Sequence, residues 1–178
     1  ITGASSGIGK ATAWKMAEAG ATVITIARDK EQLEATQREF EANGHRLEAY
    51  VGDVTDFAQV DALVQQIIAD HGGVDILVNN AGRSIRRAVE NSFDRFHDYE
   101  RTMQLNYFGA LRLTMGLLPK MIEKKSGHVI NISSIGVLTN APRFSAYVAS
   151  KAALDAWTRC AASEFADVGL KFTTINMP

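Results

Sequence analysis

The chain opens with the nine residues ITGASSGIG (1–9), and this stretch decides the expected fold. Ile1 and Thr2 are typical of a strand end, and the residues from Ile8 to Ala19 have the composition of a helix that stops at Gly20. A glycine-rich turn between a strand and a helix lets a phosphate approach the backbone. The helix start also offers free N–H groups and a positive dipole end. The stretch therefore predicts a phosphate site, with a tight turn that binds nothing as the alternative, since G-x-x-x-G-x-G differs from the usual G-x-G-x-x-G.

Short apolar runs alternate with amphipathic stretches along the rest of the chain. Strands are expected at residues 22–26, 46–51, 74–78, 128–132 and 171–175, and helices at 8–19, 29–43, 56–71, within 93–125 and at 145–166. Continuous apolar strands separated by helices favour a parallel sheet that is covered on both faces. We therefore expect an α/β fold with a three-layer, doubly wound parallel sheet of the Rossmann type.

Composition excludes several classes of protein. The chain has 178 residues, of which 46% are hydrophobic and 22% charged, and these values are ordinary for one globular domain. A net charge of -1 gives no support for a nucleic-acid partner. The single cysteine, the lack of a signal peptide and the lack of an apolar run of about 20 residues favour a cytoplasmic protein without a membrane span.

Both ends of the sequence look cut. Only two residues precede the glycine turn, and the last expected strand stops at Pro178 with nothing after it. We therefore expect residues 1–178 to be a single nucleotide-binding domain that is incomplete, without its first strand and its C-terminal substrate region.

The end of the expected strand at residues 22–26 predicts which dinucleotide binds. Folds that bind NAD usually place an acidic residue there to hold the ribose 2′-OH. This chain has Ala27 at that place and Arg28 next, whereas Asp29 comes one residue later and is typical of a helix cap. A guanidinium group binds phosphate through its planar fork, so Arg28 predicts NADP(H) rather than NAD(H).

Two further segments fit a nucleotide crevice. Asp53, followed by Val54, comes after the expected strand at residues 46–51, where a carboxylate can accept from an adenine amino group; a cap at a helix start is the alternative. Asn79, Asn80, Ala81 and Gly82 follow the next strand, at the strand ends where open α/β sheets bind ligands.

A tyrosine, a lysine and a serine supply the candidate chemistry. Tyr147 and Lys151 lie four residues apart on one expected helix, so their side chains are neighbours. A nearby ammonium favours the phenolate and lowers the pKa of a tyrosine, which can then exchange a proton with a carbonyl oxygen. Ser134 follows the expected strand at residues 128–132 and can hydrogen-bond the same oxygen. A surface pair is the alternative for a lone Tyr-x-x-x-Lys.

Taken together, the motifs TGASSGIG, NNAG, the serine after VINIS, YVASK and Asn106 resemble the short-chain dehydrogenase/reductase superfamily. The resemblance runs from Thr2 to the end of the chain. It implies that Ser134 positions the carbonyl, that Tyr147 is the acid/base, that Lys151 lowers the pKa of the tyrosine and holds the nicotinamide ribose, and that Asn106 supports the lysine through water. One departure is Met177-Pro178, where the family usually has Pro-Gly.

The resemblance also implies a cofactor site and an assembly. Gly3, Gly7 and Gly9 would cradle the pyrophosphate. The full expected NADP(H) contact set is Gly3, Ser5, Ser6, Gly7, Ile8, Gly9, Arg28, Asp53, Val54, Asn80, Ala81, Gly82, Tyr147 and Lys151. In this superfamily the long helix and the Tyr147 helix commonly pack across a twofold axis. We therefore expect a homodimer or homotetramer, in which Tyr107, Phe108 and Leu111 could form an exposed stripe.

Residues 81–113 and 133–160 resemble, more narrowly, the reductase part of bacterial fatty acyl-CoA reductases. This implies an NADPH-dependent oxidoreductase that converts a long-chain acyl thioester to an aldehyde. Reduction of another carbonyl, such as a 3-oxoacyl chain, a steroid or a sugar-like ketone, is the first alternative. A non-catalytic nucleotide sensor is the second, and the intact Ser134, Tyr147 and Lys151 set argues against it.

The cysteine, the histidines and the arginines after NNAG are further candidates for a functional site. Cys160 is expected to face away from Lys151 as a small buried thiol rather than a nucleophile, because nine residues place it on the opposite side of the helix. The four histidines show no metal-ligand spacing, so no metal is expected. Arg83, Arg86 and Arg87 form either a solvated loop or a patch that attracts the phosphates of CoA or of an acyl carrier protein.

Overall fold

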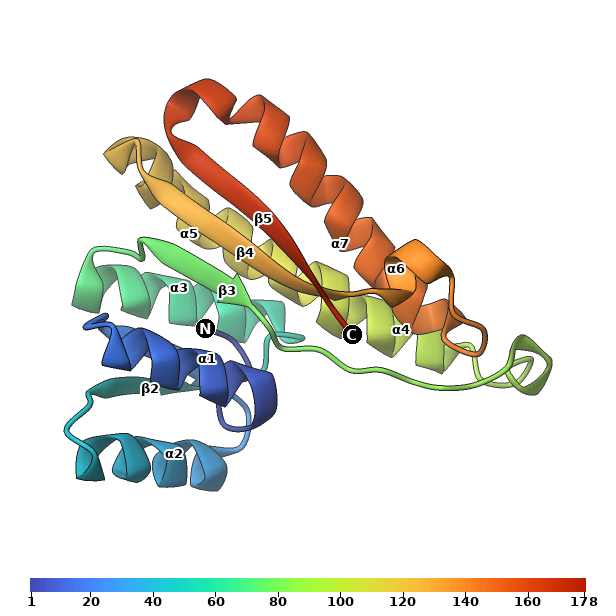
Figure 1. Cartoon of the computed structure of the whole chain (residues 1–178), viewed down its shortest axis with the longest axis horizontal. Helices are drawn as coiled ribbons and strands as arrows, with labels where there is room; N and C mark the ends of the chain where they lie inside the picture. Colours follow the sequence, from blue (N-terminus) through green and yellow to red (C-terminus); the bar gives the residue numbers. More distant parts are fainter. The chain divides into compact units, whose positions relative to one another are not determined.

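The structure, a computed structural model, describes all 178 residues and groups them in two units, Ile1–Asp53 and Val54–Pro178. The first unit contains α1 (Gly7–Glu18), β1 (Val23–Ala27), α2 (Lys30–Ala42) and β2 (Leu47–Val51) (Figure 1). Strands β1 and β2 pair in parallel, with Val23 opposite Leu47. Thr2 forms a single parallel bridge with Ile26, so the residues before the glycine turn lie beside β1 as a strand does.

Small residues allow the helices of the first unit to pack closely. Ala13 and Ala17 of α1 share a buried cluster with Val23, Phe40 and Leu47. The expected cap of α2 is confirmed, because the Asp29 side chain accepts from the backbone N–H of Gln32 at 3.0 Å.

The second unit is built on three parallel strands in the order β3 (Ile76–Asn79), β4 (Gly127–Ser134) and β5 (Leu170–Met177). Its longer helices are α3 (Phe57–His71), α5 (Ala110–Lys124) and α7 (Ser145–Glu164), and its shorter ones are α4 (His97–Met103) and α6 (Gly136–Thr139). Turns of 3-10 helix occur at η1 (Val89–Asn91) and η3 (Ala166–Val168), and a π-helix occurs at η2 (Gln104–Gly109).

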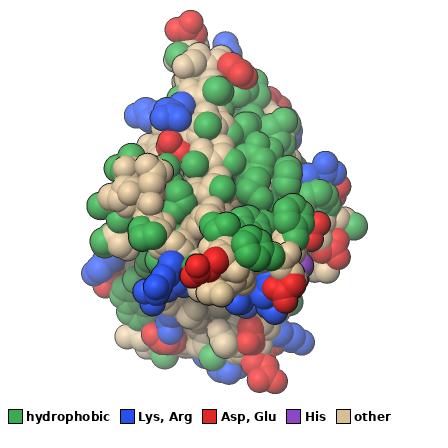
Figure 2. Space-filling view, turned by 90° about the vertical axis from the view of Figure 1, so that its right-hand side faces the viewer, with side chains coloured by type: hydrophobic (Ala, Val, Ile, Leu, Met, Phe, Trp, Pro, Cys, Tyr) green, Lys and Arg blue, Asp and Glu red, His purple; other side chains and the backbone are tan.

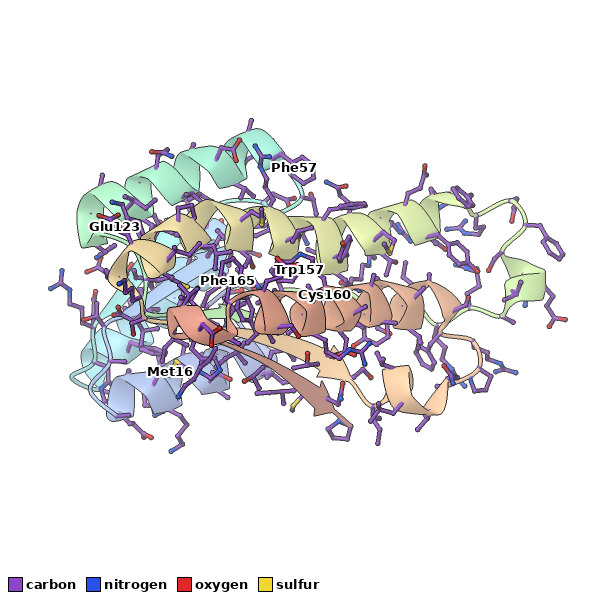
Figure 3. The ribbon with its side chains drawn as sticks, turned by 90° about the horizontal axis from the view of Figure 1, so that it is seen from above. Met16, Phe57, Glu123, Trp157, Cys160 and Phe165 are labelled. Atoms are coloured by element: carbon purple, nitrogen blue, oxygen red, sulfur yellow. The ribbon has the colours of Figure 1, made fainter.

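Helix α5 lies between α3 and α7 when the structure is seen from above (Figure 3). Its buried residues include Leu113, Leu117 and Met121. Gly116 brings α5 close to α3, because a Cβ there would lie 2.8 Å from the Val64 side chain. Helix α7 packs on β4 and β5, so the helix that carries Tyr147 is fixed directly on the sheet.

The parallel α/β organisation of the Rossmann type is confirmed, and the expected burial of Cys160 is wrong. The segment 93–125 is mostly helical as expected, and its first helix, α4, begins at His97 after the 3-10 turn η1. The π-helix and α6 were not foreseen. Cys160 is exposed on α7 rather than buried (Figure 3), because the buried line of that helix runs through Lys151, Leu154, Thr158 and Ala161. No helix combines the length and the apolar character that crossing a membrane requires.

Candidate functional site

The glycine turn in the first unit has the geometry of an anion site. Gly3 and Gly7 have φ values of 67° and 55°, which side-chain-bearing residues rarely adopt. Helix α1 begins at Gly7, and the side chain of its N-cap residue, Ser6, makes no capping hydrogen bond. Ser6, Gly7 and Ile8 are exposed while Gly9 is buried. The start of a 12-residue helix therefore faces solvent, as a phosphate-binding turn requires.

The turn is tied to the neighbouring helix. The Thr36 hydroxyl of α2 contacts both the Gln32 carbonyl at 2.9 Å and the Ser5 carbonyl at 3.3 Å. Thr36 is buried. Ser5 is therefore placed through its backbone, and its side chain is left for other contacts.

Arg28 and Asp53 were assigned separate tasks from the sequence, and the structure brings them together. Arg28 Nη1 lies 3.5 Å from Asp53 Oδ2, at the ends of the paired strands β1 and β2. The Arg28 side chain is 66% exposed, so this long ion pair is worth little and leaves the guanidinium open to a phosphate. Asp53 is not the cap of α3, because Asp56 fills that position.

In the second unit, Lys151 is buried at the centre of the expected catalytic set. Its side-chain Nζ donates to the Ile132 carbonyl at 2.7 Å. Burial lowers the pKa of the Lys151 ammonium from its ordinary value of 10.5 to about 8. Only one of the three donors of the ammonium is used in this bond, so donors remain for a bound group.

Gly82 leaves space beside that ammonium. A Cβ at Gly82 would lie 3.3 Å from both Lys151 Nζ and Asn106 Oδ1. Glycine therefore fits here without displacing either side chain, and the expected residues Gly82, Asn106 and Lys151 do meet. Asn80 and Ala81, which precede Gly82, are half-buried.

Asn106 lies in the π-helix and connects two segments. Its amide Nδ2 donates to the Arg83 carbonyl and to Ser150 Oγ, both at 2.9 Å, while its Oδ1 accepts from the Arg83 N–H at 2.8 Å. Gly109 ends the π-helix, and a Cβ there would lie 2.5 Å from the Val54 carbonyl. Val54 itself is buried, so its side chain is covered.

Ser150 is a residue that the sequence analysis missed. It is fully buried, accepts from Asn106 and donates through Oγ to the Tyr147 carbonyl at 2.7 Å. The Asn106 side chain is thereby connected to the backbone of the tyrosine. The available signal was the serine directly before Lys151 in YVASK.

Ser134 and Tyr147 are both half-buried. Ser134 Oγ accepts from the Gly136 N–H at 3.1 Å, which keeps the hydroxyl hydrogen available as a donor. A Cβ at Gly136 would touch both Val148, at 3.2 Å, and Ser134 Oγ, at 3.4 Å. The end of β4 and the first turn of α7 therefore approach each other at Gly136.

A buried polar ladder lies among the same strands. Asn79 Nδ2 donates to Thr114 Oγ1 at 2.9 Å and to Asn131 Oδ1 at 2.8 Å, and Asn131 Nδ2 donates to Thr158 Oγ1 at 2.8 Å. The ladder holds β3 and β4 to α5 and α7. Of the two asparagines in NNAG, the first is therefore committed to structure.

The three arginines after NNAG do not act as one patch. Arg83 is held through its backbone by Asn106, and Arg86 is exposed. Arg87 turns to Asp98, where its Nε donates to Oδ2 at 3.1 Å. The solvated-loop interpretation therefore fails for Arg87, whose side chain has an ionic partner.

Comparison with known proteins gives a consistent result. The family model described as short chain dehydrogenase matches residues 1–178. A fatty acyl-CoA reductase of Acinetobacter baylyi is 58% identical over 178 residues, which are 100% of this chain and 60% of that protein. The chain thus spans less than two thirds of this relative.

Solved structures agree on the fold. A short-chain dehydrogenase of Streptomyces avermitilis has 42% identity and a TM-score of 0.91, over 99% of this chain and 63% of its own. A metagenomic short-chain oxidoreductase in complex with NADP has 33% identity and a TM-score of 0.92, over 99% of this chain and 79% of its own. Both structures therefore share sequence as well as fold with this chain.

Proposed function

Because the chain belongs to the short-chain dehydrogenase family, we propose that it is an NADPH-dependent reductase of long-chain fatty acyl thioesters that releases an aldehyde. The observation that carries the proposal is the meeting of Lys151 Nζ, Asn106 and Gly82 beside the helix turn of Tyr147. Lys151 follows Tyr147 by four residues on α7, so its buried ammonium would assist proton transfer from that tyrosine to a carbonyl.

Several residues of the chain are suited to hold the separate groups of one dinucleotide. The exposed start of α1 at Ser6, Gly7 and Ile8 would hold the pyrophosphate, and Arg28 would hold a ribose 2′-phosphate. Lys151, with donors to spare beside Gly82, would hold the nicotinamide ribose. When bound, NADPH supplies the hydride for the carbonyl carbon.

The protein's own part is to orient the carbonyl and supply a proton. Ser134 Oγ would donate to the carbonyl oxygen, and Tyr147 Oη would give it a proton as negative charge develops there. With a thioester, addition of a hydride and a proton yields a hemithioacetal. Its collapse breaks the C–S bond and releases an aldehyde and a thiol, so no cysteine nucleophile is needed.

NADP(H) is favoured over NAD(H) by the residues at the end of β1. Ala27 offers no carboxylate that would repel a 2′-phosphate, and the Arg28 side chain is 66% exposed. The weak pair with Asp53 is easily exchanged for a phosphate with a larger charge. The NADP complex of a structural relative is consistent with this choice.

The proposed assembly is a homodimer or homotetramer that pairs α5 and α7 with those of a second copy. Phe108, 42% exposed, and Met115, 54% exposed, lie on η2 and α5, where a partner would cover them. Tyr107 and Leu111 are half-buried, so the expected stripe is narrower than the sequence indicated.

The decisive experiment follows NADPH oxidation with matched acyl-CoA, aldehyde and ketone substrates, and identifies the product. We expect the highest kcat/KM with a long-chain acyl-CoA and release of an aldehyde. A higher kcat/KM with a 3-oxoacyl, steroid or sugar-like ketone would instead favour the first alternative. Binding of NADPH without turnover of any carbonyl would favour a nucleotide sensor.

A further inference from the structure

Asp98, in the first turn of α4, collects cations from three places in the chain. Its side chain is 3% exposed. Arg87 Nε lies 3.1 Å and Arg95 Nε 3.4 Å from Oδ2, His97 Nε2 lies 3.4 Å from Oδ1, and Arg101 pairs with Oδ1. We call Arg87, Arg95, Arg101 and Asp98 the arginine cluster.

Positive charge is in excess within the arginine cluster. Burial works to raise the pKa of Asp98, but the guanidinium groups of Arg101, Arg95 and Arg87 outweigh it and the pKa is lowered. Asp98 is therefore ionised at neutral pH and offsets only one of the three permanently charged guanidinium groups. An anion near them would be attracted rather than repelled.

The way in which the arginines are held leaves donors available. Arg87 and Arg95 both reach Asp98 through Nε, and a guanidinium group has five N–H donors. Their terminal Nη groups take no part in these bonds to the carboxylate. The side chains of Arg87, Arg95 and Arg101 are 35%, 38% and 42% exposed, so solvent reaches them. The buried carboxylate thus fixes their orientation, which reduces the entropy lost when an oxyanion binds.

The arginine cluster is joined to the start of the proposed catalytic helix. The Arg87 N–H donates to the Arg143 carbonyl at 2.7 Å, four residues before Tyr147. Tyr99 of α4 and Ser145 of α7 share a hydrogen bond of 2.9 Å between their hydroxyls. A substrate carbonyl at Tyr147 would therefore have its remote groups within reach of this part of the unit.

Exposed apolar side chains occur in the same part of the unit. On the side of the molecule that lies at the right of Figure 1, Figure 2 shows a broad apolar area with both basic and acidic side chains around it. The exposed apolar residues of η1, the segment before α4, and α6 are Val89, Phe93, Phe96 and Leu138. A ligand with both phosphate groups and an alkyl chain matches this combination better than either a free phosphate or a fatty acid.

We propose that Arg87, Arg95 and Arg101, oriented by Asp98, bind the phosphate groups of the CoA portion of an acyl-CoA. The proposal rests on the proposed thioester reductase function and adds a recognition site that is separate from the cofactor residue Arg28. Arg86, which the sequence placed with Arg87, is not one of its members. The alternative is that the arginine cluster only stabilises the fold of residues 87–101 and binds no ligand.

The test compares two thioesters in the variant Arg95→Gln/Arg101→Gln. Palmitoyl-CoA carries the phosphates, and S-palmitoyl-N-acetylcysteamine has the same thioester without them. We expect KM for palmitoyl-CoA to rise about tenfold or more, to a degree that shrinks as salt screens the charges. KM for the phosphate-free thioester should change less than about twofold. Arg159→Gln, which removes an exposed arginine paired with Asp155 on α7, should change neither.

Equal effects on both thioesters, or no effect on either, would overturn the proposal. Circular dichroism checks folding. If the double variant unfolds, Arg95→Gln alone gives the same comparison, since Arg87 and Arg101 remain paired with Asp98.

A binding measurement separates this site from the proposed reaction. Isothermal titration of CoA into protein saturated with NADP⁺ excludes binding at the cofactor turn. Affinity that is lost in Arg95→Gln/Arg101→Gln supports the site even if no thioester is reduced, in which case only the proposed function fails. Thioester reduction without phosphate-dependent binding would refute the site and leave the function standing.

Discussion

The two units expose their functional groups in opposite ways. In Ile1–Asp53 the candidate groups are a backbone turn and a charged side chain at the surface, Ser6 to Ile8 and Arg28. In Val54–Pro178 they are the buried side chains of Asn106, Ser150 and Lys151, connected by hydrogen bonds. The difference teaches that a binding preference can be altered by a surface exchange, whereas the proposed catalytic set depends on packing.

In the second unit, the largest effect is expected from Tyr147→Phe. Loss of the phenol should lower kcat by at least about 10²-fold, the usual scale of general acid catalysis, while the Kd for NADPH stays within about twofold. Single-turnover kinetics and cofactor titration measure the two quantities. Near-normal turnover in a folded variant would remove Tyr147 from the proposed mechanism.

Substitutions at the end of β1, in the first unit, should change the cofactor preference rather than the chemical step. Ala27→Asp with Arg28→Ala should reverse the cofactor preference, which we expect to be at least about tenfold for NADPH in kcat/KM, or about 1.4 kcal/mol. Arg28→Ala should change the free energy of unfolding little, because Arg28 is largely exposed and its ion pair is long, whereas Ala27→Asp should lower it, because Ala27 is only 7% exposed. Equal use of NADH and NADPH by the unmodified protein would contradict this assignment.

Ser150→Ala examines the connection between Asn106 and Tyr147. Removing the hydroxyl deletes one buried and one partly buried hydrogen bond, and we expect kcat to fall about fivefold with a smaller change in KM, on the scale of about 1 kcal/mol. Ser163→Ala is the matched control, since its hydroxyl contacts a carbonyl on the exposed side of the same helix. In a double-mutant cycle, Ser150→Ala and Asn106→Ala should be non-additive in kcat. Additive losses would mean that the two residues act independently.

The smallest expected effect is that of Lys151→Met on the free energy of unfolding of the cofactor-free protein. Because burial lowers the pKa of Lys151 to about 8, the unfolded chain binds more protons between this value and 10.5, and stability rises with pH across that range. The cost of the buried charge is therefore largest below pH 8. Lys151→Met should stabilise the cofactor-free protein by roughly 1–2 kcal/mol at pH 7, since the lost bond to Ile132 offsets part of the gain.

This stabilisation should shrink as the pH is raised toward 10.5. Thermal unfolding at several pH values measures it, and Lys30→Met, at an exposed lysine, is the control. A stabilisation that is constant with pH would show that packing of the methionine, rather than removal of a buried charge, is responsible.

Features that depend on residues close together in the chain could be predicted from the sequence. The glycine turn, the cap at Asp29 and the alternation of strands and helices depend on residues close in the chain, and the structure confirms them. The order of motifs also predicted the family, which the match over residues 1–178 confirms. The contact set for NADP(H) and the roles of Ser134, Tyr147 and Lys151 remain predictions.

Contacts between residues that are far apart in the chain could not be predicted from the sequence and are known from the structure. Asn106 and Ser150, which share a hydrogen bond, are 44 residues apart. Arg87 forms an ion pair with Asp98, on the other side of the turn η1, and does not form a basic patch with Arg86. The hydrophobic periodicity of the sequence does not indicate the π-helix that contains Asn106. Cys160 is exposed because it is not one of the residues on the buried face of α7. A side chain's partners depend on the packing of whole elements, and spacing along one chain carries that information only within an element.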